Sequence, residues 1–391
     1  MRTPEQTKRI EALDGLAESF RARAPQLDRD AVFPEENFRD LHAAGILALT
    51  LPVKWGGQGL WGDEGFVEYY EVLEHLASID APTAQLLQVH LHAIGMLAHA
   101  ATEEQARKYL IPIVEAGRRV ASVGSESVPG KKGAGASTSE LTRNADGTWS
   151  LTCEKHFASL GPGADHFIIW LAVPGTEDYD HRSVAVLVDR HAPEVEMIDN
   201  WDTLGMRATV SQGIRITGMT IPADAVFGEP GWWETHDPRT FTLGFASNHI
   251  GSARGALNFA TAWVRDRPNL AGSELIQFQL GEMSADLFAA REALFAAARL
   301  WEGDDPAAAE YASVQALTVA KRISLEITQR ALDVCGARSM FKSYELERIY
   351  RDTRTFTLHY RVDNYTRELG AAMIADGYAV KGNGGITAVA N

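Results

Sequence analysis

Residues 33–60 read FPEENFRDLHAAGILALTLPVKWGGQGL, a stretch that ends in a glycine-rich turn and lies inside a long helical segment. From residue 4 to about 117, apolar residues recur three and four positions apart, as in FVEYYEVLEHL at 66–76. The sequence TEEQ at 102–105 has the pattern of a capping box and predicts a helix that runs to about Glu115. The first third of the chain is therefore predicted to be helical.

Between about 119 and 232 the apolar period changes to two and turn residues become frequent. The sequence WSLTCE at 149–154 follows the turn at 144–147 and predicts one strand of a hairpin. Residues 166–173 alternate less and are rich in Ile, Phe and Trp, which is typical of a strand covered on both faces. These patterns predict a small sheet domain in the middle of the chain.

Helical spacing returns after residue 238, over roughly 239–266, 273–303 and 306–335. Asp305 and Pro306 suit the N-cap and the first helical position of the third stretch. The sequence thus predicts an α+β protein with a helical domain at 1–118, a β domain at 119–235 and a helical bundle at 236–391.

Composition excludes several classes of partner. With 391 residues and 45% hydrophobic content the chain can form a large core, and its net charge of −15 disfavours nucleic acid and anionic lipid. Cys153 and Cys335 have neither disulfide-framework nor zinc-ligand spacing, so no metal is expected. No signal-peptide pattern and no apolar run of about 18 residues occurs. We expect a soluble cytoplasmic protein.

Several motifs, in order along the chain, resemble those of the acyl-CoA dehydrogenase superfamily. The stretch 33–60 resembles the family's N-terminal helix and Pro-x-x-x-Gly-Gly turn, and LGMRATVSQGIRITGMTIPADAVFGEPG at 204–231 resembles the strand pair that closes its sheet domain. The resemblance extends almost to the C-terminus. It implies the acyl-CoA dehydrogenase-like fold and a bound flavin.

Two further segments resemble the family's flavin-binding strands. Ser125 and Glu126, in ASVGSESVPG, stand where the family has a Thr-Glu-Pro segment along the flavin, although Ser127 replaces the proline. In CEKHFASLGPGAD at 153–165, Phe157 stands where an aromatic residue covers the flavin ring and Ser159 where a hydroxyl approaches flavin N5. Without these motifs, Ser125 and Ser159 would be ordinary strand or turn hydroxyls.

The sequence departs from a dehydrogenase at the catalytic base. Removing a proton alpha to a thioester carbonyl requires a carboxylate. In the family this is a Glu soon after an Arg-Asp pair, and here Arg351 and Asp352 are followed by His359 and Tyr360 at the matching place. The alternative position for the base, near 241–242, holds no carboxylate. Asp363 would lie about one turn, or roughly 6 Å, beyond His359. Dehydrogenation is therefore disfavoured.

The segment RTFTLH at 354–359 instead resembles the C-terminal signature of dibenzothiophene monooxygenase and related flavin-dependent monooxygenases. That resemblance implies reduced flavin supplied by a separate reductase, a C4a-hydroperoxide formed with oxygen, and transfer of one oxygen atom to a small, fairly apolar substrate. His359 suits this role because an imidazole accepts a proton or hydrogen-bonds near neutral pH. The alternative is a histidine that serves only surface or core packing.

His90 and His92, in QLLQVHLHAIGML, lie in the helix that in this family lines the substrate side of the flavin. Residues two apart cannot share one helix face, so at most one of them reaches the site, and the sequence does not choose between them. A metal pair on a strand is disfavoured because the flanking Leu and Ala pattern is helical.

The motifs that bind the diphosphate and adenine of FAD in this family are blurred. In the first motif Arg267 is kept, but a Leu-Ala pair replaces the expected Phe-Gly. In the second, a three-glycine turn that a neighbouring subunit donates in this family, only Gly336 remains. Close approach of backbone to phosphate needs such glycines, so FMN is favoured over FAD, with Arg267 as a phosphate ligand. The resemblance also implies a homotetramer. Four aromatic residues can wall an apolar pocket or serve only the core or an interface: Phe157, Trp201, Trp232 and Trp233.

Two rival functions remain. The first is an acyl-CoA dehydrogenase with a relocated base, whose flavin would be bleached anaerobically by an acyl-CoA. The second is a non-catalytic scaffold subunit of the same superfamily, which would bind flavin poorly.

Overall fold

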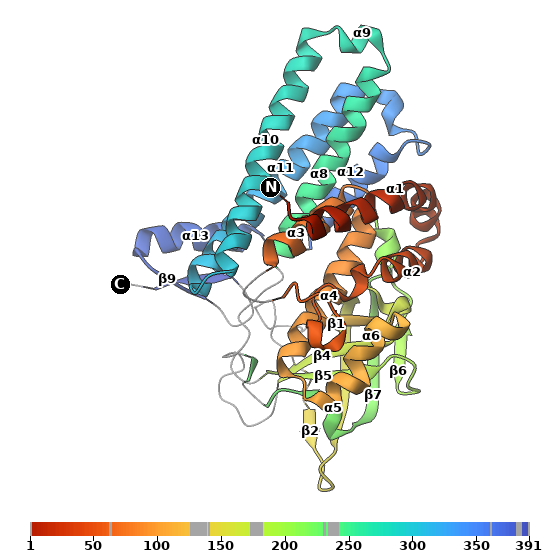
Figure 1. Ribbon diagram of the computed structural model, residues 1–391, viewed down its shortest axis with the longest axis vertical. Coiled ribbons are helices and arrows are strands. Elements are labelled where there is room, and N and C mark those ends of the chain that lie inside the picture. The colour runs from red at the N-terminus through yellow and green to blue at the C-terminus, as the bar shows by residue number, and fades with distance from the viewer. Residues whose placement is uncertain are drawn as a thin grey trace.

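A computed structural model describes residues 2–61, 65–125, 139, 141–172, 183–229, 232–233, 242–359, 362–380 and 385–389. Helices occupy both ends of the chain and two small sheets occupy its middle, at the opposite end of the molecule from the long C-terminal helices (Figure 1). The protein is therefore α+β, as predicted.

In the described N-terminal part of the chain, before β1, every regular element is a helix. Thr102 caps α5, with its hydroxyl accepting from the Gln105 N–H and the Gln105 side chain accepting from the Thr102 N–H, so the predicted capping box is confirmed. The helix that it starts contains one π-helical turn, 106–110, before it ends at Ala116. The elements are α1 (Pro4–Asp30), α2 (Glu35–Ala43), α3 (Phe66–Ala77), α4 (Ala81–Ala100), α5 (Glu103–Gln105) and α6 (Ile111–Ala116).

Two four-stranded sheets form the middle of the chain. One has the order β1-β4-β5-β8, with only the β1–β4 pair parallel, and the other is antiparallel with the order β2-β3-β7-β6. The strands predicted at 149–154 and 166–173 are β3 and β4, and β3 is longer than predicted. Residues 167–169 of β4 are fully buried, as expected of a strand covered on both faces. The strands are β1 (Val120–Val123), β2 (Leu141–Arg143), β3 (Trp149–Ala158), β4 (His166–Ala172), β5 (Ser183–Asp189), β6 (Val195–Ile198), β7 (Gln212–Ile221) and β8 (Val226–Phe227).

The C-terminal part contains the three predicted long helices as α8, α10 and α11. Asp305 accepts a hydrogen bond from the Ala308 N–H at 2.9 Å, which confirms the predicted cap of α11. A short C-terminal hairpin, β9 with β10, was not predicted. The elements are α8 (Thr242–Arg265), α9 (Pro268–Ala271), α10 (Glu274–Trp301), α11 (Pro306–Cys335), α12 (Glu345–Phe356), α13 (Val362–Ala375), β9 (Tyr378–Val380) and β10 (Ile386–Ala388).

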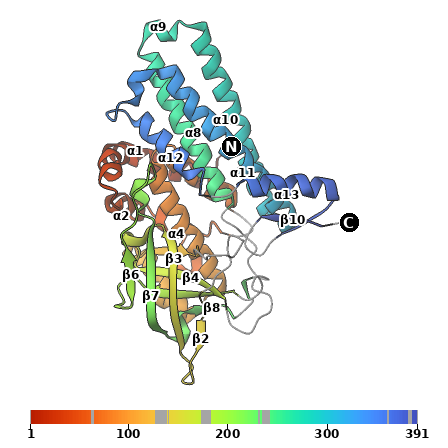
Figure 2. The ribbon, with the colours of Figure 1, turned by 180° about the vertical axis from the view of Figure 1, so that it is seen from behind.

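Helix α8 joins the two helical parts, passing from α9 at the tip of the bundle to α4 beside the sheets (Figure 2). Gly251 allows α8 to approach α3 closely, because a Cβ added at this position would lie 2.3 Å from the Glu74 carbonyl oxygen on α3. The predicted division at 118/119 falls between α6 and β1, and that at 235/236 falls outside the described residues. None of the helices in the described part of the chain combines the length and the apolarity needed to cross a bilayer.

Candidate active site between the β3 bulge and the start of helix α8

The end of β3 carries the first group of predicted site residues. Its pairing with β7 shifts register between Lys155 and Ala158, and within this bulge Phe157 has a φ of 58°. Positive φ is uncommon for a residue with a side chain and persists only where the surroundings enforce it. The Phe157 side chain is 58% exposed, in contrast to the buried neighbours that flank it, Lys155 and Ala158. The bulge thus presents an aromatic ring outward, as binding a planar ligand requires.

Ser159 follows the bulge and is 5% exposed. Its hydroxyl lies 2.7 Å from that of Ser211, which lies 2.8 Å from the hydroxyl of Thr209. Sequence reasoning missed Ser211 and Thr209, although both lie in the 204–231 segment that carries the family resemblance. No local signal marks them, because only the pairing of β3 with β7 brings them to Ser159.

The segment after β1 runs beside the same bulge. The Ser125 carbonyl oxygen accepts a hydrogen bond of 2.8 Å from the His156 N–H, and the Ser125 side chain is exposed. Ser125 is therefore close to Phe157 in space as well as by motif. Glu126 lies outside the described residues.

The four aromatic residues considered for a pocket wall form two separate pairs, Phe157 with Trp201 and Trp232 with Trp233. The rings of Phe157 and Trp201 lie 6.4 Å apart and nearly perpendicular. Trp233 is buried and packs against Trp170 and Trp232 at 5.1 and 4.8 Å. Phe157 and Trp201 therefore remain candidates for the pocket, whereas Trp233 serves the core.

His359 lies just after α12. Its ring lies 4.8 Å from Phe245 of α8 and 5.8 Å from Phe356. The residue is exposed, yet the surrounding protein desolvates the imidazole and lowers its pKa below the usual value. The two properties agree for a ring that packs on aromatic side chains and keeps a solvent-facing side. His359 is thus neutral and approachable at neutral pH.

The two histidines of α4 face different surroundings, as their spacing predicts. The His90 ring accepts a hydrogen bond from the Val120 N–H on one nitrogen and donates to the Leu47 carbonyl oxygen from the other, each at 3.0 Å. With both nitrogens engaged by backbone, His90 joins α4 to β1. This geometry favours His92 over His90 as a site residue.

His92 lies one helical turn beyond Gln88 on the same face of α4. That face meets the start of α8, where Asn248 donates to Gln88 at 3.0 Å and a Cβ on Gly244 would lie 2.4 Å from the Gln88 amide. His92 is buried, with its ring 4.9 Å from Trp61, and burial lowers its pKa to about 3. His359 thus packs directly on the start of α8, whereas His92 packs on Trp61, one turn along α4 from the Gln88 contact with α8.

Arg267 and Gly336 lie elsewhere. Arg267 precedes α9 at the tip of the helical bundle, away from the sheets (Figure 1). Its guanidinium stacks 3.5 Å from the centre of the Trp263 ring, and it is close enough to Cys335 to act on the pKa of that thiol. Gly336 is the residue after Cys335; it has a φ of 73°, and the space into which a side chain would point is open. A single chain does not bring this pair to Phe157, Ser159 and His359.

The Arg351-Asp352 pair has a structural role that the sequence did not reveal. Arg351 binds Asp28 of α1 at 2.7 Å and donates to the Leu204 carbonyl oxygen at 2.9 Å. Asp352 accepts from the Met206 N–H at 2.5 Å. The pair thus ties α12 to the N-terminal helices and to the sheet domain.

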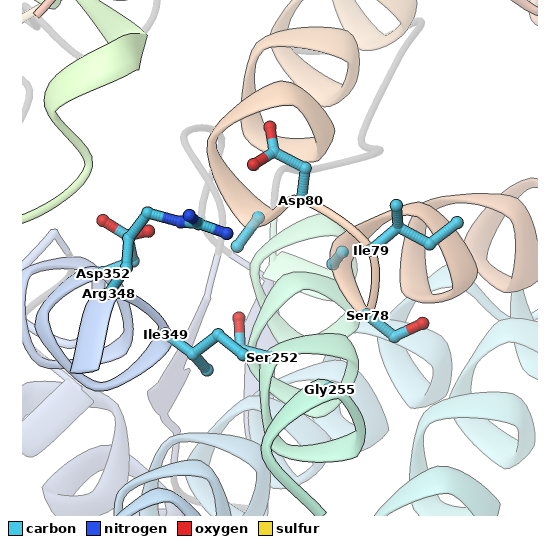
Figure 3. A pocket seen from close by; sticks show the side chains of 10 residues that line it. Ser78, Ile79, Asp80, Ser252, Gly255, Arg348, Ile349 and Asp352 are labelled. Atoms are coloured by element: carbon cyan, nitrogen blue, oxygen red, sulfur yellow. The ribbon is translucent and has the colours of Figure 1, made fainter. Parts of the chain in front are cut away.

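Asp352 also lines a cavity of about 10 Å³ where α12 meets α8 and the turn before α4 (Figure 3). The Arg348 side chain extends over this cavity toward Asp80 and Asp352 (Figure 3). Burial raises the pKa of Asp352 to about 7. The cavity has room for about one water molecule and is too small for a substrate.

Among the described residues, no group of three or more His, Cys, Asp or Glu side chains is arranged to hold a metal ion. The sheet side of the candidate site holds an exposed aromatic ring and a buried hydroxyl chain, and its helical side holds two imidazoles, those of His92 and His359.

Comparison with known proteins identifies the family to which these elements belong. The acyl-CoA dehydrogenase N-terminal domain matches residues 3–116 and the acyl-CoA dehydrogenase C-terminal domain matches residues 243–364. A putative acyl-CoA dehydrogenase, YdbM of Bacillus subtilis, is 27% identical over 90% of this chain and 92% of its own. Dibenzothiophene monooxygenase of Rhodococcus erythropolis is 26% identical over 94% of this chain and 93% of its own.

Among solved structures, FMN-bound TdsC from Paenibacillus sp. A11-2 superimposes with a TM-score of 0.85 at 25% identity, covering 95% of this chain and 98% of that one. The relatives thus include both monooxygenases and dehydrogenases at similar identity. By its domains, its fold and its relatives, the chain is a flavin-dependent oxidoreductase that belongs to the acyl-CoA dehydrogenase superfamily.

Proposed function

We propose that this protein is the oxygenase of a two-component flavin-dependent monooxygenase. It would take reduced flavin from a separate reductase and insert one atom of molecular oxygen into a small, fairly apolar substrate. The observation that carries the proposal is His359: a neutral, approachable imidazole, packed on Phe245, stands where a dehydrogenase needs a carboxylate base.

The carboxylates near this position are otherwise engaged. Asp363 of α13 has a side chain that is 98% exposed and lies 3.8 Å from Lys321. Glu310 of α11 is fully buried beside the start of α8, where it accepts hydrogen bonds from the Thr242 hydroxyl and the Gly385 N–H. Both geometries disfavour proton abstraction from a substrate carbon.

The donor set at the sheet–helix junction fits a flavin. Phe157 would cover the ring, the segment that contains Ser125 would lie along its edge, and Ser159 would hydrogen-bond to it. When bound, the reduced flavin supplies the electrons that activate oxygen. His359 would hold or accept the proton that the substrate or oxygen exchanges, while Phe245 and Trp201 limit access of water. The likeness to FMN-bound TdsC supports FMN over FAD.

We further propose that the active assembly is a homotetramer in which Arg267 and Gly336 complete the site of a neighbouring chain. In support, α10 exposes three large apolar side chains, Leu275, Phe278 and Phe288, each more than 60% exposed in the single chain. Leu275 and Phe278 lie one turn apart on the same face of α10, and exposed apolar side chains of this size suit a surface buried by a second copy.

The test is to bind anaerobically reduced FMN or FAD, mix with oxygenated buffer in a stopped-flow instrument and follow the flavin spectrum. We expect a transient spectrum distinct from both the reduced and the oxidised flavin. Anaerobic bleaching of the bound oxidised flavin by an acyl-CoA would overturn the proposal in favour of a dehydrogenase. Failure to bind either flavin in either redox state would favour a non-catalytic scaffold.

A further inference from the structure

A chain of three buried hydroxyls runs inward from the proposed flavin surface. Ser159, Ser211 and Thr209 are each 6% exposed or less. Successive oxygen atoms lie 2.7 and 2.8 Å apart, and the chain ends where the Thr209 hydroxyl donates to the Met206 carbonyl oxygen at 2.8 Å. Each link has the length of a good O–H to O hydrogen bond.

The last link sets the direction of the whole chain. A carbonyl oxygen only accepts, so the single hydroxyl hydrogen of Thr209 is used on Met206. Thr209 must then accept the hydrogen of Ser211, and Ser211 must accept the hydrogen of Ser159. In this arrangement Ser159 turns its hydrogen inward and offers a lone pair outward.

The reverse arrangement leaves Met206 with one hydrogen bond fewer. Its carbonyl oxygen would keep the Thr209 N–H at 3.1 Å and the Trp201 indole N–H at 3.3 Å but lose the hydroxyl. A buried carbonyl that loses a partner disfavours the reversal, although its remaining donors keep the penalty moderate.

We propose that Ser211 and Thr209 are positioning residues that hold Ser159 as a hydrogen-bond acceptor and thereby make the site select reduced over oxidised flavin. This rests on the proposed function, in which Ser159 meets the flavin at N5. Nitrogen N5 carries a hydrogen in reduced flavin and a lone pair in oxidised flavin. An acceptor at Ser159 therefore complements the reduced form and confronts a lone pair in the oxidised form.

The measurement is the pair of dissociation constants for oxidised FMN and for anaerobically reduced FMN. Ser211→Ala removes the inward acceptor of Ser159 and frees its hydrogen to turn outward. We expect the ratio of the oxidised to the reduced dissociation constant to fall by roughly two- to tenfold. Thr209→Val should shift the ratio in the same direction, because Ser211 then has only Ser159 to donate to.

Two controls isolate the chain of hydroxyls. Ser252→Ala removes a buried hydroxyl that donates to Asn248 within α8 and should leave the ratio unchanged. In a Ser159→Ala background, Ser211→Ala should also have no effect on the ratio. A shift that persists in that background, or an unchanged ratio in both Ser211→Ala and Thr209→Val, would overturn the role of the chain. If the unmodified protein binds neither FMN nor FAD in either redox state, the proposed function itself fails.

Discussion

At the scale of single residues, two candidate site residues, Phe157 and His359, are more exposed than the aromatic residues they pack against. Phe157 is exposed in a strand whose other apolar residues are largely buried, and its backbone has a conformation that few side chains adopt. His359 keeps a solvent-facing side while its counterpart on α8, His249, is buried 4.7 Å from Phe356 and has its pKa lowered to about 3. Exposure distinguishes His359 from the structural His249, whereas the other candidate site histidine, His92, is buried.

His359→Ala tests this assignment. Loss of the imidazole should lower turnover by on the order of 100-fold, because general acid–base catalysis contributes about that much, while flavin affinity stays within about twofold. The measurement is kcat beside a flavin titration, with His191→Ala, an exposed histidine of the sheet domain, as the matched control. An undiminished rate in His359→Ala would remove the residue from the mechanism.

At the scale of elements, the predictions succeeded where a pattern is local. The cap at Asp305 and the buried strand 166–172 depend on a few adjacent residues, and both are present. The contact of Ser159 with Ser211 spans 52 positions and depends on a register that a bulge shifts, so no local pattern reports it. The same limit applies to His90 and His92. Their spacing predicts that they lie on different faces of the helix, but it does not predict which of the two faces packs against the backbone of β1.

The packing of α8 on α3 offers a prediction about stability. A methyl group at Gly251 would collide with the Glu74 carbonyl oxygen and the Ala77 side chain, so Gly251→Ala should destabilise the fold by about 1 to 3 kcal/mol. Gly15, inside α1, has nothing within 4 Å of the added carbon, and Gly15→Ala should be stabilising by about 0.5 to 1 kcal/mol. Urea denaturation of both variants compares them directly; equal effects would contradict the close contact between the helices.

At the scale of the whole molecule, three buried histidines should make stability fall as pH falls, while Asp352, whose pKa burial raises to about 7, should contribute in the opposite direction. Burial lowers the pKa of His90 to about 4 and that of His92 and His249 to about 3. The unfolded chain takes up protons near pH 6.5 while the folded chain does not, so stability is complete above that pH and is lost as pH falls toward 4.

Each of the three histidines should remove about 2 kcal/mol of stability between pH 8 and pH 5. Urea midpoints across this range measure the loss, and His92→Asn should flatten the profile. His191 is exposed on the sheet domain, so His191→Ala serves as the control and should leave the profile unchanged. A profile that is the same in His92→Asn as in the unmodified protein would show that this ring takes up its proton in the folded state as readily as in the unfolded chain.

The proposed sharing of sites between chains also belongs to this scale. An assembly made only of Arg267→Ala chains should lose its affinity for flavin. An assembly made only of His359→Ala chains should bind flavin but lose turnover. If one chain supplies Arg267 and its neighbour supplies His359, random equal mixing of the two variants should restore roughly a quarter of the sites. Dissociating, mixing and reassembling the variants before an activity assay measures this. Activity no greater than that of the separate variants would place both residues in the site of one chain.

The ion pairs of Glu74 have a consequence for the order in which the protein is made. This fully buried carboxylate on α3 lies 3.1 Å from Arg254 and 3.2 Å from Arg291, which follow it by 180 and 217 residues. At ordinary rates of translation the first of these arginines leaves the ribosome about 10 to 40 s after Glu74. During that interval Glu74 lacks both of these counter-charges and α3 lacks the helix that covers it, so the nascent chain should depend on holding chaperones until α8 has been synthesised.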